Sequence, residues 1–432
     1  MAINVQNIRN FAVAGHTGCG KTSLCDLILF KSGAVDRCGS VDQKNSISDY
    51  TLDEQEKLSS IYAAPLNCKW NDNHFFFVDT PGYGEFIGEV VAPIHCSDAV
   101  LIVLDGVKGI EVGSSRAWKL AKENEIPRFI FINRLDREMA DFEKVMAQLQ
   151  DVYGANLCIP ITLPVGKENN LKSVINILKG KDIPADIAHE AGKYKEKIMD
   201  TIAESDEELM VRYLDGQELS EEEISKGLHK AIMEGKLVPV FAGSVAKDIG
   251  IVELMNGIVN LFPNPLSRKE IKLADGSKHD ISAEGPGIAL VFKTIIDPFI
   301  GQFSIFRVFS GKISSDSEAF NTSIGEKERL GSIVLLNGKN QSPIPELVPG
   351  FIGAVTKLKN THISNTLVSG NLKIQLQHIK FPAPVMSYAI MPSKSGDEDK
   401  ISQGLAKICD SDYTVKSERH VETREMLLSS MG

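Results

Sequence analysis

Eight consecutive residues decide the fold of this chain: Gly15-His16-Thr17-Gly18-Cys19-Gly20-Lys21-Thr22. They match the pattern G-x-x-x-x-G-K-[ST] of a phosphate-binding loop, or P-loop, at every fixed position. An apolar run at residues 11–14 leads into the loop, and Leu24, Leu27 and Ile28 recur at helical spacing after it. A strand, this loop and a helix in that order predict a nucleotide site, because backbone N–H groups and the helix N-terminus point toward the phosphates.

Three side chains of the loop carry separate predictions. We expect Lys21 to contact the β- and γ-phosphates and the Thr22 hydroxyl to ligate Mg²⁺. Cys19 lies among backbone amides that favour anions, which predicts an unusually acidic thiol. The simpler interpretation of Cys19 is a small side chain that fits the loop.

A second motif, Asp79-Thr80-Pro81-Gly82-Tyr83, follows a Phe-rich run at residues 74–78 that predicts a buried strand. We expect the Asp79 carboxylate to hold Mg²⁺ through water and Gly82 to offer its N–H to a γ-phosphate. The whole motif is therefore expected to lie at the nucleotide and to act as a switch.

A third motif, Asn133-Arg134-Leu135-Asp136, follows apolar runs at residues 100–104 and 129–132 and is a variant of the guanine-reading N-K-x-D. The Asp136 carboxylate can accept hydrogen bonds from the N1–H and the exocyclic amine of guanine, a pattern that adenine does not offer. We expect Ser244 and Val245, after the apolar run at residues 238–241, to close over the base. Alone, N-R-L-D also fits a loop with helix-capping aspartates. Its order after the other two motifs favours GTP and GDP, and disfavours a metabolic P-loop kinase.

The three motifs together resemble elongation factor G, and above all its paralogues with tyrosine at the end of the second motif. The segment from Asp49-Tyr50 to Ser60-Ile61 is similar to switch I, so the resemblance implies that Ser60 replaces an Mg²⁺-binding threonine. Segments 133–137, 140–142, 349–355 and 384–387 are also similar, and the resemblance covers essentially the whole chain. It implies a GTPase that acts on the ribosome, in translocation or in ribosome disassembly, with ribosomal RNA and stalk proteins as partners. Release-factor GTPases share the early domains but normally keep a histidine in the second motif.

The chain departs from the family pattern in both switches and in the guanine motif. Lys57-Leu58 replaces Arg-Gly in switch I, and Ser60 lacks the methyl group that restricts χ1 in threonine. Arg134 replaces the lysine of N-K-x-D and keeps its charge on a bulkier planar group. We expect this change to weaken nucleotide binding at most.

Tyr83 is the departure that bears on catalysis. The family has a histidine there, which orients the attacking water and, when charged, stabilises the transition state. A phenol has a pKa of about 10 and is neutral near pH 7, but its hydroxyl can hold a water. With Gly82 and Lys21, Tyr83 forms the candidate catalytic set, and we expect slow GTP hydrolysis. The alternatives are a ribosome-binding module with little hydrolysis, and a Tyr83 that packs against apolar residues outside the pocket.

The chain divides into three parts by pattern. Residues 1–265 alternate strands and helices, which predicts an α/β P-loop GTPase domain with a parallel sheet covered on both faces. An inserted α/β subdomain is expected at about 157–237, with a helical pattern at Ile198, Ile202, Leu209 and Tyr213. Its acidic runs 204–208 and 221–223 are either solvated helix faces or a docking site for stalk proteins.

Short alternating strands such as 291–293 and 303–305 predict a β-barrel over 280–380. Residues 382–432 resemble the α+β, ferredoxin-like third domain of the family, with strands near 385–390, 414 and 426 and a helix over 398–409. The resemblance implies that this domain is incomplete at residue 432.

Composition agrees with a globular cytoplasmic protein. The chain has 432 residues, 43% apolar and 24% charged, with a net charge of −10, which opposes non-specific coating of nucleic acid but permits local ribosome contacts. No apolar run approaches a membrane span, so we expect no membrane contact, and we expect a monomer. The seven cysteines fit reduced thiols, and the nine histidines show no H-E-x-x-H spacing.

Overall fold

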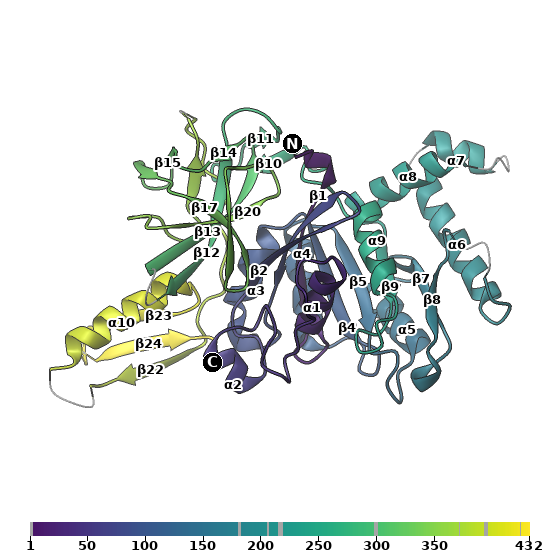
Figure 1. Ribbon diagram of the computed structural model, residues 1–432, viewed down its shortest axis with the longest axis horizontal. Coiled ribbons are helices and arrows are strands. Elements are labelled where there is room, and N and C mark those ends of the chain that lie inside the picture. Colours follow the sequence, from purple (N-terminus) through teal and green to yellow (C-terminus); the bar gives the residue numbers. More distant parts are fainter. Residues whose placement is uncertain are drawn as a thin grey trace.

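The computed structural model describes residues 3–179, 183–204, 207–214, 219–297, 301–370, 372–392, 396–423 and 425–432. Figure 1 shows the elements spread along one long axis. A large sheet with its helices lies in the middle, the strand-rich part lies beside it, and the C-terminal elements and the inserted helices lie at opposite ends.

The central sheet has seven strands in the order β2-β3-β1-β4-β5-β9-β6. They are β1 (Ile8–Gly15), β2 (Ala64–Trp70), β3 (Asn73–Asp79), β4 (Ala99–Asp105), β5 (Arg128–Asn133), β6 (Cys158–Pro160) and β9 (Val238–Ala242). The predicted parallel sheet is confirmed from β3 to β6. The edge strand β2 was not predicted, and it runs antiparallel to β3. Asn71 and Asp72 join these two strands with φ of 44° and 60°, the two-residue turn that suits an antiparallel hairpin.

Helices cover this sheet because its middle strands are apolar on both faces. All seven residues of β4 are buried, as expected for a strand inside a parallel sheet. Two helix pairs contact β1 or its neighbours: α1 packs against α9, and α3 packs against α4. The helices of this part are α1 (Lys21–Lys31), α2 (Leu52–Lys57), α3 (Gly88–His95), α4 (Val112–Glu123), α5 (Phe142–Tyr153) and α9 (Ile251–Leu261).

The inserted elements project from the sheet at one end of the molecule (Figure 1). They are the hairpin β7 (Thr162–Val165) and β8 (Ser173–Asn176), and the helices α6 (Ala188–Ala203), α7 (Glu207–Leu214) and α8 (Glu221–Met233). The predicted helical pattern from Ile198 to Tyr213 therefore falls on two helices. Residues 205 and 206 of the first acidic run lie outside the described residues. The second acidic run opens α8, where carboxylates favour the helix N-terminus.

The strand-rich part is an eight-stranded antiparallel sheet in the order β16-β15-β21-β12-β13-β20-β17-β18. Its strands are β12 (Ile288–Asp297), β13 (Gly301–Ser310), β15 (Glu318–Asn321), β16 (Glu326–Arg329), β17 (Ile333–Asn337), β18 (Asn340–Ile344), β20 (Ile352–Thr356) and β21 (Thr366–Val368). Two short hairpins accompany it: β10 (Glu270–Lys272) with β11 (Lys278–Asp280), and β14 (Ile313–Ser314) with β19 (Glu346–Leu347). The strands predicted as short at 291–293 and 303–305 belong to β12 and β13, which have 10 residues each.

The C-terminal part is α+β, as predicted. Strands β22 (Met386–Ile390), β23 (Lys416–Arg419) and β24 (Met426–Ser430) form an antiparallel sheet in the order β22-β24-β23. Helix α10 (Glu398–Ser411) connects the first strand to the other two. Within the described ranges, none of the helices is long and apolar enough to cross a membrane.

Buried contacts fix the barrel strands against the central sheet. The Arg307 guanidinium on β13 donates to the Asp98 carboxylate at 2.5 Å and to the Cys96 carbonyl at 2.8 Å. Both side chains of this ion pair are nearly inaccessible, at 2% and 4% exposure. The rings of Phe76 and Phe351 also join the two parts and lie 4.1 Å apart between centres. The two parts therefore share one interior.

Candidate nucleotide site

The P-loop lies at the carboxyl end of β1 and runs into α1, which begins at Lys21. Gly20 has φ of 94°, and a Cβ there would lie 2.5 Å from the Asn133 side-chain nitrogen. A residue with a side chain would therefore be strained and would collide with the guanine motif. Lys21 is buried and donates from Nζ to the His16 carbonyl at 2.8 Å, so its ammonium lies across the mouth of the loop.

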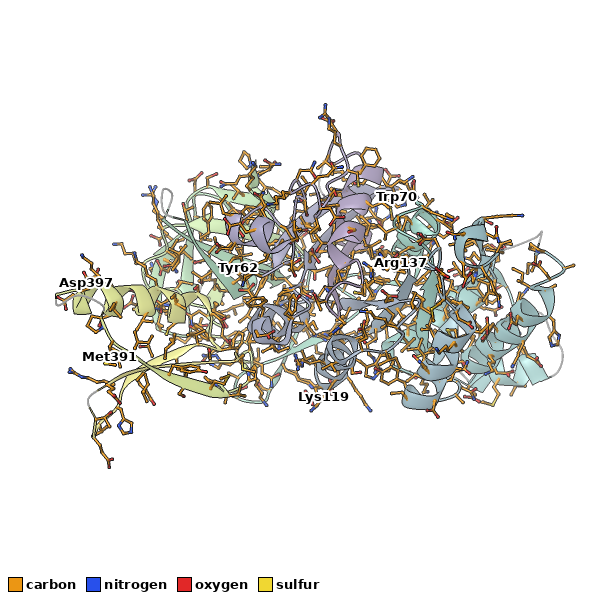
Figure 2. The ribbon with its side chains drawn as sticks, turned by 90° about the horizontal axis from the view of Figure 1, so that it is seen from below. Tyr62, Trp70, Lys119, Arg137, Met391 and Asp397 are labelled. Carbon is orange, nitrogen blue, oxygen red and sulfur yellow. The ribbon has the colours of Figure 1, made fainter. Side chains whose placement is uncertain are left out.

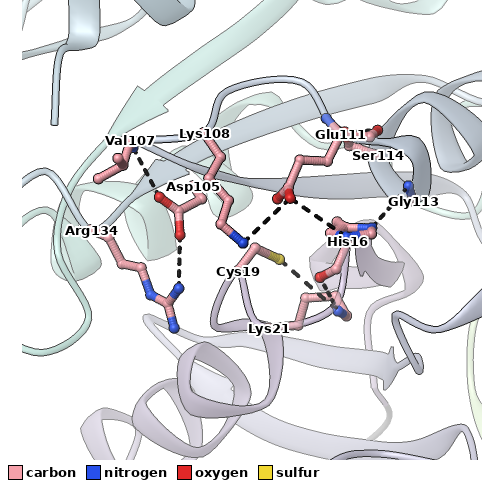
Figure 3. A network of polar contacts seen from close by, with 10 residues as sticks. All are labelled: His16, Cys19, Lys21, Asp105, Val107, Lys108, Glu111, Gly113, Ser114 and Arg134. Carbon is pink, nitrogen blue, oxygen red and sulfur yellow. Dashed lines mark hydrogen bonds and ion pairs between the residues drawn. The ribbon is translucent and has the colours of Figure 1, made fainter. Parts of the chain in front are cut away.

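His16 is tied to the loop before α4. Its Nδ1 accepts a hydrogen bond from the Gly113 backbone N–H at 3.3 Å, and its Nε2 lies 3.5 Å from a Glu111 carboxylate oxygen. The Lys108 ammonium lies 3.5 Å from the same carboxylate oxygen. Figure 3 shows these contacts beside the P-loop. The sequence predicted His16 only as a member of the loop, and its partners come from a segment that no motif marked.

The predicted metal-binding residues lie together. The Thr22 and Ser60 hydroxyl oxygens are 2.9 Å apart in a buried position. The Asp79 carboxyl is 1% exposed, and neither of its oxygens has a hydrogen-bond partner within the described part of the chain. Burial raises the pKa of Asp79 to about 6, and the Lys21 charge opposes that rise.

A second buried carboxyl, Asp49 of switch I, lies near Asp79 and was not predicted as a site residue. Its oxygens also lack hydrogen-bond partners among the described residues. Burial, and then the Asp79 charge, raise the pKa of Asp49 to about 8. The described residues contain no group of three His, Cys, Asp or Glu side chains arranged to hold a metal. Two hydroxyls beside buried carboxylates do fit Mg²⁺, which prefers oxygen ligands and keeps waters and phosphate oxygens in its shell.

The second motif is anchored against the P-loop. The Thr80 hydroxyl donates to the Val13 carbonyl at 2.8 Å, which fixes the chain after β3. A Cβ at Gly82 would lie 2.5 Å from the Thr17 backbone nitrogen and 2.7 Å from Lys21 Nζ. Only glycine brings its backbone this close to the loop and its lysine. Pro81, between them, is buried.

Tyr83 lies at the rim of this site. Its side chain is 45% exposed, and its ring makes an edge contact with Phe86 at 6.5 Å between centres. The residue also lines a small cavity with Gly15, Gly113 and Arg116. The ring therefore contacts one apolar side chain and also borders the P-loop. The two hypotheses for Tyr83, a hydroxyl that holds the attacking water and a ring that packs outside the pocket, both stay predictions.

The guanine motif is joined to two other loops by Asn133. Its side-chain nitrogen donates to the Cys19 carbonyl at 2.9 Å, and its oxygen accepts from the Val245 N–H at 3.0 Å. The Asp136 carboxylate accepts from the Ser244 hydroxyl at 2.5 Å. The Leu135 N–H donates to the Gly243 carbonyl at 3.3 Å. The structure thus brings together the residues that the sequence assigned to the base.

Arg134 has a partner that the motif did not reveal. Its backbone has φ of 64°, and its guanidinium donates to the Asp105 carboxylate of β4 at 2.7 Å. Burial alone would raise the pKa of Asp105, but the hydrogen bond from Arg134 and nearby amides lower it overall. Figure 3 shows this ion pair on the side of the P-loop opposite His16. Arg134, which stands where the motif has lysine, is therefore paired with the Asp105 carboxylate at the end of β4.

The predicted acidity of Cys19 is wrong. Its side chain is 1% exposed, and burial raises the pKa of the thiol although the Lys21 charge lowers it. A Cβ at Gly15 would lie 3.1 Å from the sulfur, and Lys21 Nζ lies 4.0 Å from it, so the thiol is enclosed by the loop. The simpler prediction, a small side chain that fits, agrees with this placement.

Three family descriptions match the chain in order. Residues 6–264 match the elongation factor Tu GTP binding domain, residues 286–370 match elongation factor G domain 2, and residues 381–432 match elongation factor G domain III. A crystal structure of a protein from Thermus thermophilus superposes with a TM-score of 0.89 at 27% sequence identity. The superposition covers 99% of this chain and 64% of that one.

Proposed function

Because this chain belongs to the elongation factor G family of translational GTPases, we propose that it binds GTP and GDP with Mg²⁺ and works on the ribosome as a nucleotide-dependent switch. The contact between Thr22 and Ser60 carries this proposal. It joins the P-loop to switch I beside the buried Asp79 carboxyl, so these oxygen-bearing side chains are the ones that would hold Mg²⁺ near the phosphates.

We assign the phosphates to the P-loop, with Lys21 and the Gly82 N–H at the γ-phosphate. Thr22 and Ser60 would hold Mg²⁺ directly and Asp79 would hold it through water. Bound Mg²⁺ supplies neutralisation of charge on the β- and γ-phosphates. The set assigned to the base is Asn133, Arg134, Leu135, Asp136, Ser244 and Val245.

For hydrolysis we propose a slow GTPase in which Tyr83 holds the attacking water through its hydroxyl. A neutral phenol does not stabilise transition-state charge as an imidazolium does. A second candidate function, a GTP-dependent ribosome-binding module with little hydrolysis, is favoured by the exposed position of Tyr83 and its contact with Phe86.

The ribosomal role that we propose is translocation or ribosome disassembly, by a cytoplasmic monomer that contacts ribosomal RNA and stalk proteins. The support is the family membership and the presence of the barrel and third-domain parts beside the switch (Figure 1). The chain spans 64% of the solved relative, so the role of the whole protein is inferred through these shared parts.

The test is nucleotide-dependent binding of the purified chain to ribosomes. We expect cosedimentation with a non-hydrolysable GTP analogue and Mg²⁺, and much less with GDP. Lys21→Ala, which removes the ammonium at the loop, should bind ribosomes equally poorly with either nucleotide. Equal cosedimentation of the native chain with both nucleotides would reject the switch.

A further inference from the structure

Glu89 of α3 receives contacts from two other parts of the molecule. Its Oε2 accepts a hydrogen bond from the Ala63 backbone N–H at 2.6 Å, and the same oxygen forms an ion pair with Lys293 Nζ of β12. The two charged side chains are 13% and 6% exposed. One carboxylate therefore joins α3, the chain directly after switch I, and the barrel.

Glu89 contacts the chain at Ala63, three residues after Ser60 of switch I. Each of the four residues 60–63 contacts a residue outside that range. Ser60 lies against Thr22, and the Ile61 and Tyr62 N–H groups donate to Glu54 Oε1, each at 3.1 Å. Lys293 Nζ also lies 5.4 Å from the centre of the Tyr62 ring. Figure 2 labels Tyr62 between the middle of the molecule and the end that carries Met391 and Asp397.

Charge and burial explain why Lys293 holds the Glu89 carboxylate in place. The buried Lys293 ammonium needs a countercharge, because an unpaired buried ion is costly. Glu89 supplies it with the oxygen that also receives the Ala63 N–H. Without the Lys293 ammonium, the Glu89 carboxylate can turn toward water. The Ala63 N–H, three residues after Ser60, then loses its fixed acceptor.

We propose that Lys293 and Glu89 are positioning residues through which the barrel holds Ser60 at the Mg²⁺ site. This inference rests on the proposed nucleotide function and deepens it. GTP uses the Ser60 hydroxyl through Mg²⁺, whereas GDP, which lacks the γ-phosphate, depends on it less. The pair therefore favours the GTP state, and by reciprocity bound GTP strengthens the contact between the barrel and switch I.

A purely structural role is the competing explanation, and the chain contains a matched control. The ion pair of Arg307 and Asp98 also joins the barrel to the GTPase part and is also buried. Its remaining hydrogen bond goes to the Cys96 carbonyl, which lies outside switch I. Loss of either pair should destabilise the interface, but only loss of the first should change how GTP and GDP are distinguished.

The experiment measures the affinities of a non-hydrolysable GTP analogue and of GDP, with Mg²⁺, and the thermal midpoint of each variant. Lys293→Met should lower the midpoint and weaken the GTP analogue by about tenfold, as for the loss of one net hydrogen bond to a charged group. Affinity for GDP should change by less than about threefold. The double variant Lys293→Met with Glu89→Met should regain the native thermal midpoint, because an apolar pair can replace a buried ion pair. Its affinity for the GTP analogue should stay low, because the Ala63 N–H has lost its acceptor.

Arg307→Met with Asp98→Met should show the native ratio of GTP to GDP affinity. The positioning role is overturned if both Lys293 variants keep the native ratio, or if the Arg307 variants shift it equally. If Lys293→Met does not fold, the double variant gives the ratio. A native chain that binds neither nucleotide would instead reject the proposed function, so the two failures can be told apart.

Discussion

The side-chain oxygens of Thr22 and Ser60 lie 2.9 Å apart, although 38 residues separate them in the sequence. Thr22 belongs to the first turn of α1, and Ser60 ends the segment that also contains Asp49. Their contact closes switch I onto the P-loop. Serine at position 60 therefore keeps a hydroxyl beside Thr22, as the proposed Mg²⁺ site requires.

Replacement of Asp136 by asparagine should change the preferred base. The native chain should prefer GDP to ADP by at least about 100-fold, because adenine would leave buried hydrogen-bonding groups unpaired. Asp136→Asn should shift the preference toward xanthine nucleotides, whose base offers an acceptor where guanine has a donor. Calorimetric titration with GDP, ADP and xanthosine diphosphate measures this. Ser244→Ala is the control, since it removes the hydroxyl that bonds to Asp136 at 2.5 Å and should weaken GDP without changing the preferred base. Equal affinities for ADP and GDP would contradict the assignment.

Replacement of Tyr83 by histidine should accelerate hydrolysis. Loss of a positioned catalytic group commonly costs about 10²–10⁴ in rate, so Tyr83→His should be faster on ribosomes within that range, with GTP affinity unchanged. Single-turnover GTP hydrolysis in the presence of ribosomes is the measurement. Tyr83→Phe is the matched control, because it keeps the ring against Phe86 and removes only the hydroxyl. If the native chain hydrolyses GTP as fast as Tyr83→His, tyrosine at this position does not slow hydrolysis.

Alkylation should spare Cys19. A raised pKa keeps the thiol protonated near neutral pH, and its burial blocks the reagent. Cys38 is exposed and should react with iodoacetamide first, as peptide mass mapping would show. Cys38→Ser should remove this early labelling. Rapid labelling of Cys19 that GDP suppresses would restore the acidic-thiol hypothesis.

The carboxyl pair between α5 and α6 should make stability depend on pH. Burial, and then the Glu190 charge, raise the pKa of Glu143 to about 7 from an ordinary value of 4.5. The folded state therefore binds more protons than the unfolded state between these values, so the Glu143 contribution is full below about pH 4.5 and is lost as pH rises to about 7. Glu143→Gln should flatten that part of the profile of thermal midpoint against pH. Glu123→Gln, an exposed carboxyl on α4, should leave the profile unchanged, and a profile equally steep in Glu143→Gln would exclude the pair as its cause.

Contiguous motifs allowed most of the site to be predicted. The P-loop, the second motif and N-R-L-D each occupy a few consecutive residues at a strand end, and parallel strands bring such ends to one edge. Partners far apart in the sequence could not be predicted this way: 29 residues separate Arg134 from Asp105, and 204 separate Lys293 from Glu89. The burial of Cys19 was also beyond the motif, because it depends on how the folded chain packs around the loop. The same applies to β2, whose place at the edge follows from a two-residue turn rather than from its apolar pattern.

The buried contact of Arg307 with Asp98 affects whether the barrel and the GTPase part can be exchanged separately between relatives. A guanidinium whose carboxylate lies on another part of the chain should couple the two parts into one cooperative unit, although residues 262–287 separate α9 from β12 in the sequence. Exchange of the barrel for that of a relative would transplant the cation without its anion unless both interface surfaces were exchanged together. We therefore expect a calorimetric scan to show the two parts melting in a single transition.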